Sequence, residues 1–201
     1  MRVLIISDTH GRHTAFDRAI MEAGKIDYLV HLGDTEGGED YIEAFCGCPA
    51  YILAGNNDFF SRNLREMEIY FGKKKAFMAH GHQYSVSLGV ERILDEGRSR
   101  NADIVMFGHT HRPYLKKFGD ITVLNPGSLA FPRQEGRKGS YIIMEMDRDG
   151  NAEFTIHYLD ESRWHVFLLK KGQKCVPFTR KRKIKISLKK FKKHVDFLKT
   201  L

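Results

Sequence analysis

The chain has 201 residues, of which 42% are hydrophobic and 29% are charged, and its net charge is +8. This composition is ordinary for a globular protein with one sizeable core. No apolar run approaches the roughly 20 residues that a helix needs to cross a bilayer, so we expect no transmembrane helix, and we find no signal-peptide pattern at the N-terminus.

Five short apolar runs each end at a Gly-rich or polar loop, and their Val, Ile, Leu, Phe and Tyr content predicts buried strands. In chain order the runs are Val3 to Ile6, Tyr28 to Leu32, Tyr51 to Ala54, Ala76 to Ala79 and Ile104 to Phe107. Helical spacing appears between some of them, at Ala15, Ala19, Ile20 and Ala23 and again at Val90, Ile93 and Leu94. Alternating strands and helices indicate a layered α/β domain.

The segments Tyr141 to Met146 and Glu153 to Leu159 flank a turn with the sequence DRDGN, which predicts a hairpin. The charge balance changes just after it. Residues 160–201 carry 14 Lys and Arg against 3 Asp and Glu, a net charge of +11, whereas residues 1–159 have a net charge of −3. We therefore expect a folded domain over residues 1–159 and a basic C-terminal tail over residues 160–201.

Within the tail, the basic segment Arg180 to Lys185 precedes an apolar stripe with i, i+3, i+7 spacing, which predicts a basic amphipathic helix. The stripe consists of Leu188, Phe191, Val195, Leu198 and Leu201. The favoured role of such a helix is to dock on the domain or to mediate homo-oligomer formation. The alternative role is to bind nucleic acid or another anionic surface.

Three cysteines, Cys46, Cys48 and Cys175, cannot all pair, and none belongs to a CxxC motif of the zinc-binding kind. Free thiols in a reducing compartment are therefore the favoured interpretation over a disulfide framework. Together with the absence of a signal-peptide pattern, this interpretation predicts a cytoplasmic location.

Seven polar residues stand where the expected strands run into loops, within the segments DTHG, GDTEGG, GNND, HGH and GHTH. They are Asp8, His10, Asp34, Asn56, His80, His109 and His111. Ligands bind beyond the carboxyl ends of strands in such sheets. A lone His or Asp there is commonly a cap or a turn former, but seven would have to coincide. Two carboxylates, one carboxamide and four imidazoles suit Mn, Fe, Zn, Ni or Co, whereas Mg and Ca prefer more oxygen.

These five motifs, in this order, resemble the DxH, GD, GNH[DE], H and GHxH pattern of the calcineurin-like metallophosphoesterases over about residues 1–159. The short domain, the HGH at His80 to His82 and the NPGS at Asn125 to Ser128 are most similar to the small single-domain phosphodiesterases of bacteria and archaea. The resemblance implies a four-layered α/β/β/α sandwich with two divalent metal ions, manganese first among them, at the strand ends.

The resemblance also implies the ligands of each ion. The first ion would be held by Asp8, His10, Asp34 and His111. The second would be held by Asp34, Asn56, His80 and His109. Asp34 would bridge two ions roughly 3.5 to 4 Å apart, and a hydroxide between them would attack a small phosphodiester substrate in line, without a protein nucleophile.

Asn57 departs from the family pattern, because many members carry a His there that is thought to protonate the leaving group. A carboxamide cannot act as a general acid at pH 7. Asp58 remains as the expected support for this segment. His82 matches no ligand position, and it either faces the substrate, supports the ligands or is a plain loop residue.

The NPGS segment predicts a tight turn in which Asn125 or Ser128 could reach a phosphate, although a turn that only supports the loop is the favoured interpretation. Five other histidines match no motif position, so we expect them at the surface or at helix starts. They are His13, His31, His157, His165 and His194.

Three functional interpretations follow. The first is a metal-dependent phosphodiesterase. The second is a non-catalytic metal-binding scaffold, because a retromer subunit shares this fold and Asn57 departs from the catalytic pattern. The third is a nuclease or nucleic-acid-binding module directed by the basic tail. Turnover of an activated diester separates the first two, and salt-dependent retention of oligonucleotides tests the third.

Overall fold

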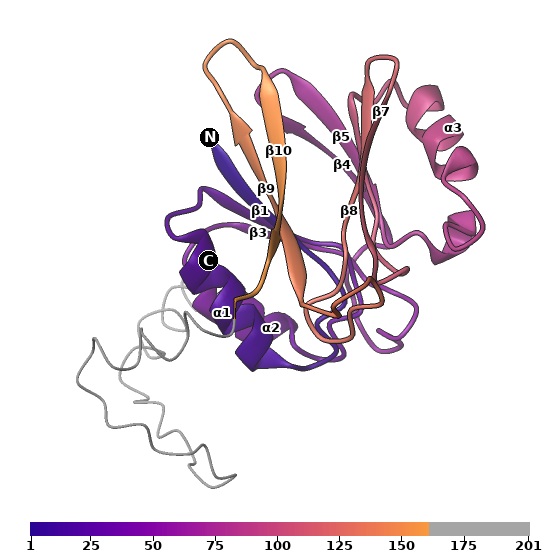
Figure 1. Ribbon diagram of the computed structural model, residues 1–201. Helices are drawn as coiled ribbons and strands as arrows, with labels where there is room; N and C mark the ends of the chain where they lie inside the picture. Colours follow the sequence, from indigo (N-terminus) through magenta and orange to yellow (C-terminus); the bar gives the residue numbers. More distant parts are fainter. Residues whose placement is uncertain (161–201) are drawn as a thin grey trace, which may run out of the picture. The chain divides into compact units, whose positions relative to one another are not determined.

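Two five-stranded β-sheets stacked face to face form the centre of the structure, a computed structural model that describes residues 1–160 (Figure 1). The strand order is β10-β9-β1-β2-β3 in the first sheet and β4-β5-β6-β8-β7 in the second. The first sheet consists of β1 (Arg2–Ile6), β2 (Tyr28–His31), β3 (Ala50–Ile52), β9 (Ser140–Met146) and β10 (Ala152–Tyr158). The second consists of β4 (Glu66–Phe71), β5 (Lys74–Ala79), β6 (Ile104–Met106), β7 (Pro113–Phe118) and β8 (Ile121–Pro126).

Helices cover the outer faces of both sheets. In Figure 1, α1 and α2 lie beside the first sheet and α3 lies beside the second. The helices are α1 (His13–Ala23), α2 (Glu39–Phe45), α3 (Glu91–Ser99) and the short 3-10 helix η1 (His82–Tyr84). The expected four-layered α/β/β/α sandwich is confirmed.

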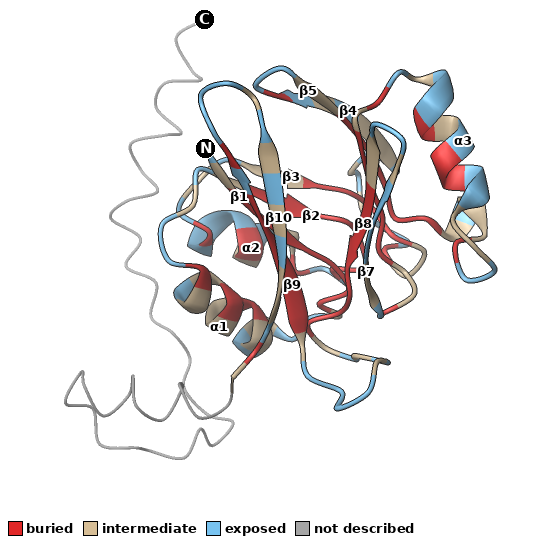
Figure 2. Cartoon of the chain, turned by 45° about the horizontal axis from the view of Figure 1, so that its top comes forward, coloured by how far each residue is buried: buried red, intermediate tan, exposed pale blue. Residues whose placement is uncertain are grey.

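The side chains of β1 show how the layers are held together. Val3 and Ile5 pack in the core between the two sheets, whereas Leu4 and Ile6 pack in a second core against α1 and α2. This division follows from the alternation of side chains along a strand. A strand covered on both faces needs apolar residues at every position, and Figure 2 accordingly shows buried residues throughout the centre of the sandwich.

All five expected strands and both expected helices are present, and β9 and β10 form the expected antiparallel hairpin. The apolar patterns do not predict α2, β4, β7 or β8. The strands β4 and β7 lie at the edges of the second sheet, where charged residues such as Glu68 and Lys116 interrupt the apolar run. Edge strands face water, so hydrophobicity marks them poorly.

Six strands end at the same edge of the sandwich. β1, β2 and β3 run parallel, as do β5, β6 and β8. We call the edge formed by the loops after these six strands the rim, which lies at the bottom of Figure 1. Every predicted metal ligand lies on one of these loops.

Other expectations from the sequence have different outcomes. His13 begins α1, as expected, and His157 is half-buried against the Tyr141 ring, 5.2 Å away between centroids. Cys46 and Cys48 are free thiols. No helix within residues 1–160 is long and apolar enough to cross a membrane. The predicted tail helix, Cys175, His165 and His194 lie outside the described residues.

His31 contradicts its prediction as a surface or helix-start residue, because it is fully buried at the end of β2. Its Nδ1 accepts a hydrogen bond of 3.2 Å from the Gly33 N–H, so the ring proton lies on Nε2, 2.9 Å from Thr9 Oγ1. Burial lowers the pKa of His31 to about 4. A neutral His31 therefore ties together the two loops that carry Asp8 and Asp34.

Mild acid should destabilise the fold through His31. Its pKa is about 4 when folded against an ordinary 6.5, so the unfolded chain takes up the proton first, and stability present above pH 6.5 falls as the pH drops towards 4. The loss by about pH 5 should be roughly 2 kcal/mol. Urea unfolding at about pH 7.5 and about pH 5 measures it. The His31→Gln variant has no titrating group at this position, so its free energy of unfolding should fall less between the two pH values. An equal fall in both proteins would contradict the assignment of the pH dependence to His31.

Candidate metal centre

The backbone turns sharply at most of the predicted ligands. Five of the seven have positive φ angles although none is glycine: Asp8 (54°), His10 (45°), Asp34 (57°), His109 (65°) and His111 (58°). Such left-handed conformations are uncommon outside glycine and cost about 1–3 kcal/mol each when strained. Their concentration at the rim indicates that the fold holds these side chains in positions that a relaxed loop would not adopt.

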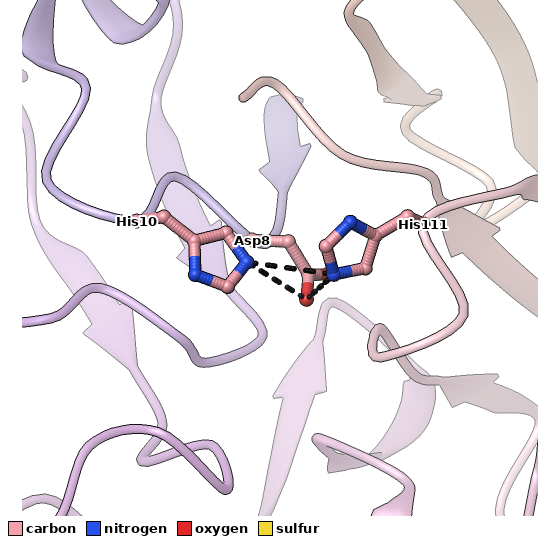
Figure 3. A group of neighbouring side chains, drawn as sticks. All are labelled: Asp8, His10 and His111. Atoms are coloured by element: carbon pink, nitrogen blue, oxygen red, sulfur yellow. Dashed lines mark hydrogen bonds and ion pairs between the residues drawn. The ribbon is translucent and has the colours of Figure 1, made fainter. Parts of the chain in front are cut away.

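The first ligand cluster consists of Asp8, His10 and His111, drawn in Figure 3. Asp8 Oδ1 lies 3.1 Å from His111 Nε2 and 3.9 Å from His10 Nε2, and the two Nε2 atoms lie 3.4 Å apart. Asp8 Oδ1 is buried and has no hydrogen-bond donor among residues 1–160. The three ligand atoms thus converge on one point.

The second cluster consists of Asp34, Asn56, His80 and His109. Asn56 Oδ1 lies 3.0 Å from His80 Nε2 and 2.9 Å from His109 Nδ1, and Asp34 Oδ2 lies 3.5 Å from His80 Nε2. Asp34 also connects the clusters, because its Oδ2 lies 4.0 Å from Nε2 of His10. All seven predicted ligands therefore lie together. Asp8, placed by the resemblance on the first ion alone, also lies close to Asp34 and His80.

The far side of each ring fixes which nitrogen faces the centre. The Nδ1 atoms of His80 and His111 lie 2.8 Å from the carbonyl oxygens of Leu32 and Phe131. A carbonyl can only accept, so Nδ1 carries the proton and the neutral Nε2 presents a lone pair to the centre. His10 Nδ1 is similarly placed 2.7 Å from Glu36 Oε1. Metal-binding histidines typically have such partners.

The sequence patterns did not identify the partners Glu36 and Phe131. Phe131 acts through its backbone carbonyl, which any residue has, so only the fold reveals it. Glu36 lies two residues after Asp34 in the GDTEGG segment. Its positive φ of 52° cannot be read from the sequence of this segment. A carboxylate close to a predicted ligand was the only available signal.

Electrostatics at the centre favour a positive charge. Burial disfavours the ionised form of Asp34, but the neighbouring His80 ring and the hydrogen bond from the Asn57 backbone outweigh it, so the pKa of Asp34 lies well below its usual range. For His80 and His111, burial opposes the charged form, yet the facing Asp34 and Asp8 raise both pKa values. Lone pairs from imidazoles and ionised carboxylates crowd the same space, which is the donor set that a divalent cation requires.

Asp58 supports the rim from behind. This buried carboxylate accepts hydrogen bonds from the backbone N–H groups of Asp34 (2.7 Å), Gly55 (2.8 Å) and Glu36 (2.7 Å), and from the Thr35 hydroxyl (3.1 Å). It therefore holds the loops after β2 and β3 in one arrangement.

Asn57 is directed towards Asp34. Its backbone N–H donates to Asp34 Oδ1 over 2.8 Å, and its side-chain Nδ2 donates to Asp34 Oδ2 over 2.7 Å. His82 lies at the edge of the second cluster, with its ring centroid 5.6 Å from that of His80 and 6.2 Å from that of His109. Its Nδ1 is buried and has no hydrogen-bond partner within the described part of the chain.

The NPGS turn faces inward. Asn125 is fully buried and donates from Nδ2 to the Gly108 carbonyl (2.6 Å) and to Thr110 Oγ1 (3.0 Å). Ser128 is also fully buried, and its hydroxyl donates to the Asp8 carbonyl over 2.9 Å. Both side chains are committed to holding ligand loops, which favours the supporting role over contact with a phosphate.

Comparison with known proteins gives four relevant similarities. Residues 1–149 match the family described as the calcineurin-like phosphoesterase superfamily domain. Over 167 residues the chain is 28% identical to "Probable metallophosphoesterase MG207" of Mycoplasma genitalium, covering 81% of this chain and 98% of that protein. Over 173 residues it is 31% identical to "Phosphodiesterase YfcE" of Escherichia coli K12, covering 73% and 89%. The crystal structure of Vps29 complexed with Zn²⁺ from Entamoeba histolytica shares the fold, with a TM-score of 0.62, 22% identity and coverage of 80% and 100%.

Replacing Gly55 with alanine should distort the centre, because the added Cβ would collide with the Asp34 carboxylate and lie 2.5 Å from the Asp34 nitrogen. Such overpacking typically costs about 1–3 kcal/mol. Gly89→Ala is the control, since its Cβ would meet only the carboxylate end of Glu91, which can rotate away. Urea unfolding should show a lower free energy of unfolding for Gly55→Ala and little change in it for Gly89→Ala. Equal stability of the two variants would contradict the close approach of the loops.

Proposed function

Because this chain belongs to the calcineurin-like phosphoesterase superfamily, we propose that it is a metal-dependent hydrolase of phosphodiesters. The convergence of seven lone-pair donors at the rim carries the proposal. In its finer form, two ions would share Asp34. The first would be held by Asp8, His10, Asp34 and His111, whose ligand atoms lie close together. The second would be held by Asp34, Asn56, His80 and His109.

Manganese is the ion that we propose first, with Ni, Fe, Zn and Co as alternatives, because imidazole and carboxylate together suit this group of ions. When bound, the ions would polarise the phosphoryl group and lower the pKa of a water molecule, which would supply the hydroxide nucleophile. The protein's own part is to present Nε2 of His10, His80 and His111 with the proton on the opposite nitrogen.

Asn57 and His82 complete the proposed site. Asn57 positions the Asp34 carboxylate through its two hydrogen bonds and has no acidic proton for the leaving group. His82, at the edge of the second cluster, faces the substrate. Asp58 keeps the loops of Asp34 and Gly55 in register. Among small diesters that bind equally well, those with good leaving groups should therefore be hydrolysed fastest.

The alternative function is a metal-binding scaffold of the same fold. Asn57 in place of the family's histidine favours it, and so does the shared fold of Vps29. The complete ligand set favours the enzyme, because a surface used only for docking does not require seven converging ligands. Diester turnover distinguishes the two functions.

We also propose a domain division. Residues 1–159 form the catalytic domain and residues 160–201 a basic tail that docks, self-associates or binds an anionic surface such as nucleic acid. Two observations support the boundary: the family match ends at residue 149, and the alignment with the Mycoplasma protein covers 98% of that relative but 81% of this chain. A cytoplasmic location is proposed with it.

Removing the shared carboxylate should abolish activity. With Mn²⁺ supplied, the protein should hydrolyse bis(p-nitrophenyl) phosphate, and Asp34→Ala should lower kcat/KM by about 10³-fold or more, because metal polarisation contributes several kcal/mol. Asp120→Ala, an equal change in the exposed turn between β7 and β8, is the control. Metal analysis should find a lower metal content than in the wild type for Asp34→Ala, and an unchanged metal content for Asp120→Ala. Wild-type turnover by Asp34→Ala, or by wild type after verified metal removal, would overturn the proposal.

The leaving-group hypothesis is tested at Asn57. Without a proton donor, kcat/KM should depend steeply on leaving-group pKa across substituted phenyl diesters, and Asn57→His should make the dependence shallower. The gain for poor leaving groups should be at most about 10²- to 10⁴-fold. Asn57→Ala removes the carboxamide without adding a donor and should keep the steep dependence. An unchanged slope in Asn57→His would show that this position does not act on the leaving group.

A further inference from the structure

Four arginines lie on loops that adjoin the first ligand cluster: Arg12, Arg112, Arg133 and Arg137. Three of them, Arg112, Arg133 and Arg137, line a cavity of about 610 Å³ together with Ala130, Phe131 and Pro132. All four are exposed, and none has an acidic partner within 4.0 Å among residues 1–160. Their guanidinium N–H groups are therefore available to a ligand. We call this feature the arginine cavity.

Phe131 joins the arginine cavity to the first ligand cluster. Its carbonyl lies 2.8 Å from His111 Nδ1, and its ring packs edge-on against His10 with 5.1 Å between centroids. The Arg12 guanidinium lies 4.2 Å above the same ring. On the other side of the cavity, the backbone N–H of Arg133 donates a hydrogen bond to the backbone carbonyl of His111 over 3.0 Å. A ligand in the cavity would thus be a close neighbour of a phosphodiester bound at the centre.

The positive charge is local. Residues 1–159 have a net charge of −3, yet the loop at residues 130–139 carries Arg133, Arg137 and Lys138 against Glu135 alone. Like charges on one side of the rim repel one another, and cations in the centre would add to that repulsion. A bound anion relieves it, so the arrangement fits a ligand with more negative charge than a single diester.

The loop that carries these arginines is held in shape. Arg137 has a positive φ of 44° and directly follows Gly136, whose φ is 75°. The backbone N–H of Arg137 donates a hydrogen bond to the Gln134 carbonyl over 3.1 Å. At the other end, the Ser128 hydroxyl accepts from the Phe131 N–H over 2.9 Å. Strained non-glycine residues persist only where the surroundings fix them, often at ligand clamps.

We propose that the arginine cavity binds a second phosphate of the substrate, so that the preferred substrates are phosphodiesters carrying another phosphate beside the scissile one. The inference rests on the proposed phosphodiesterase function. Guanidinium groups match phosphate because their planar forks donate two parallel hydrogen bonds. The second phosphate could be a terminal monoester or the next diester of a nucleotide chain, and the two sources share this chemistry.

The test compares three thymidine ligands: TpT, which has one diester, pTpT, which adds a terminal phosphate, and TpTpT, which adds a backbone phosphate. Each competes with bis(p-nitrophenyl) phosphate for the full-length, Mn²⁺-loaded protein, so its inhibition constant is measurable whether or not it is cleaved. We expect pTpT or TpTpT to bind at least about 10-fold more tightly than TpT, equivalent to about 1.4 kcal/mol.

Variants assign the preference to the arginine cavity. In Arg133→Gln/Arg137→Gln the ratio of inhibition constants should fall to within about 2-fold of unity, and a general loss of affinity cancels in the ratio. Arg148→Gln, in the turn between β9 and β10, makes the same kind of change away from the rim and should keep the wild-type ratio.

Each outcome decides between the hypotheses. A preference for pTpT that the double variant loses supports the inference and identifies a terminal phosphate, whereas a lost preference for TpTpT identifies a backbone phosphate. Equal binding of all three ligands by wild type, with bis(p-nitrophenyl) phosphate turned over, would overturn the inference and leave the function standing. A preference that survives the double variant would also overturn it. No turnover of bis(p-nitrophenyl) phosphate by the metal-loaded wild type would overturn the function and this inference with it.

Discussion

The sharp turn of the chain after β1, β2 and β6 is the constraint on which the candidate centre depends. Strands that are covered on both faces must end abruptly if a polar side chain is to reach the rim. The left-handed backbone at Asp8, His10 and Asp34 provides this change of direction at a conformational cost. The apolar cores on either side of each sheet provide the stability against which that cost is set.

Buried hydrogen bonds then select one arrangement of the loops. Asp58, Asn125, Ser128 and His31 are all buried, and each joins a ligand loop to another segment of the rim. A buried polar group without a partner is costly, so the loops cannot separate without exposing or stranding these groups. The supporting residues are thus as much a part of the centre as the ligands, although none of them has to touch a substrate.

The sequence predicted the parts of this structure that depend on short-range patterns. Buried strands such as Val3 to Ile6 are continuous apolar runs, and the ligands follow them directly, so the layers and the grouping of Asp8, His10 and Asp34 could be foreseen. Long-range contacts could not. His31 has the sequence context of any strand residue, and its burial against Thr9 depends on how two strands pair.

The candidate ligands come from both sheets. Asp8, His10, Asp34 and Asn56 follow strands of the first sheet, whereas His80, His109 and His111 follow strands of the second. Ions bound between them would therefore act as cross-links across the sandwich. Ligand-linked stabilisation amounts to about 2.7 kcal/mol at a free-ion concentration of 100 times the dissociation constant. The ions proposed for the chemistry would then also stabilise the packing of one sheet on the other. The free-ion concentration would set the size of this stabilisation.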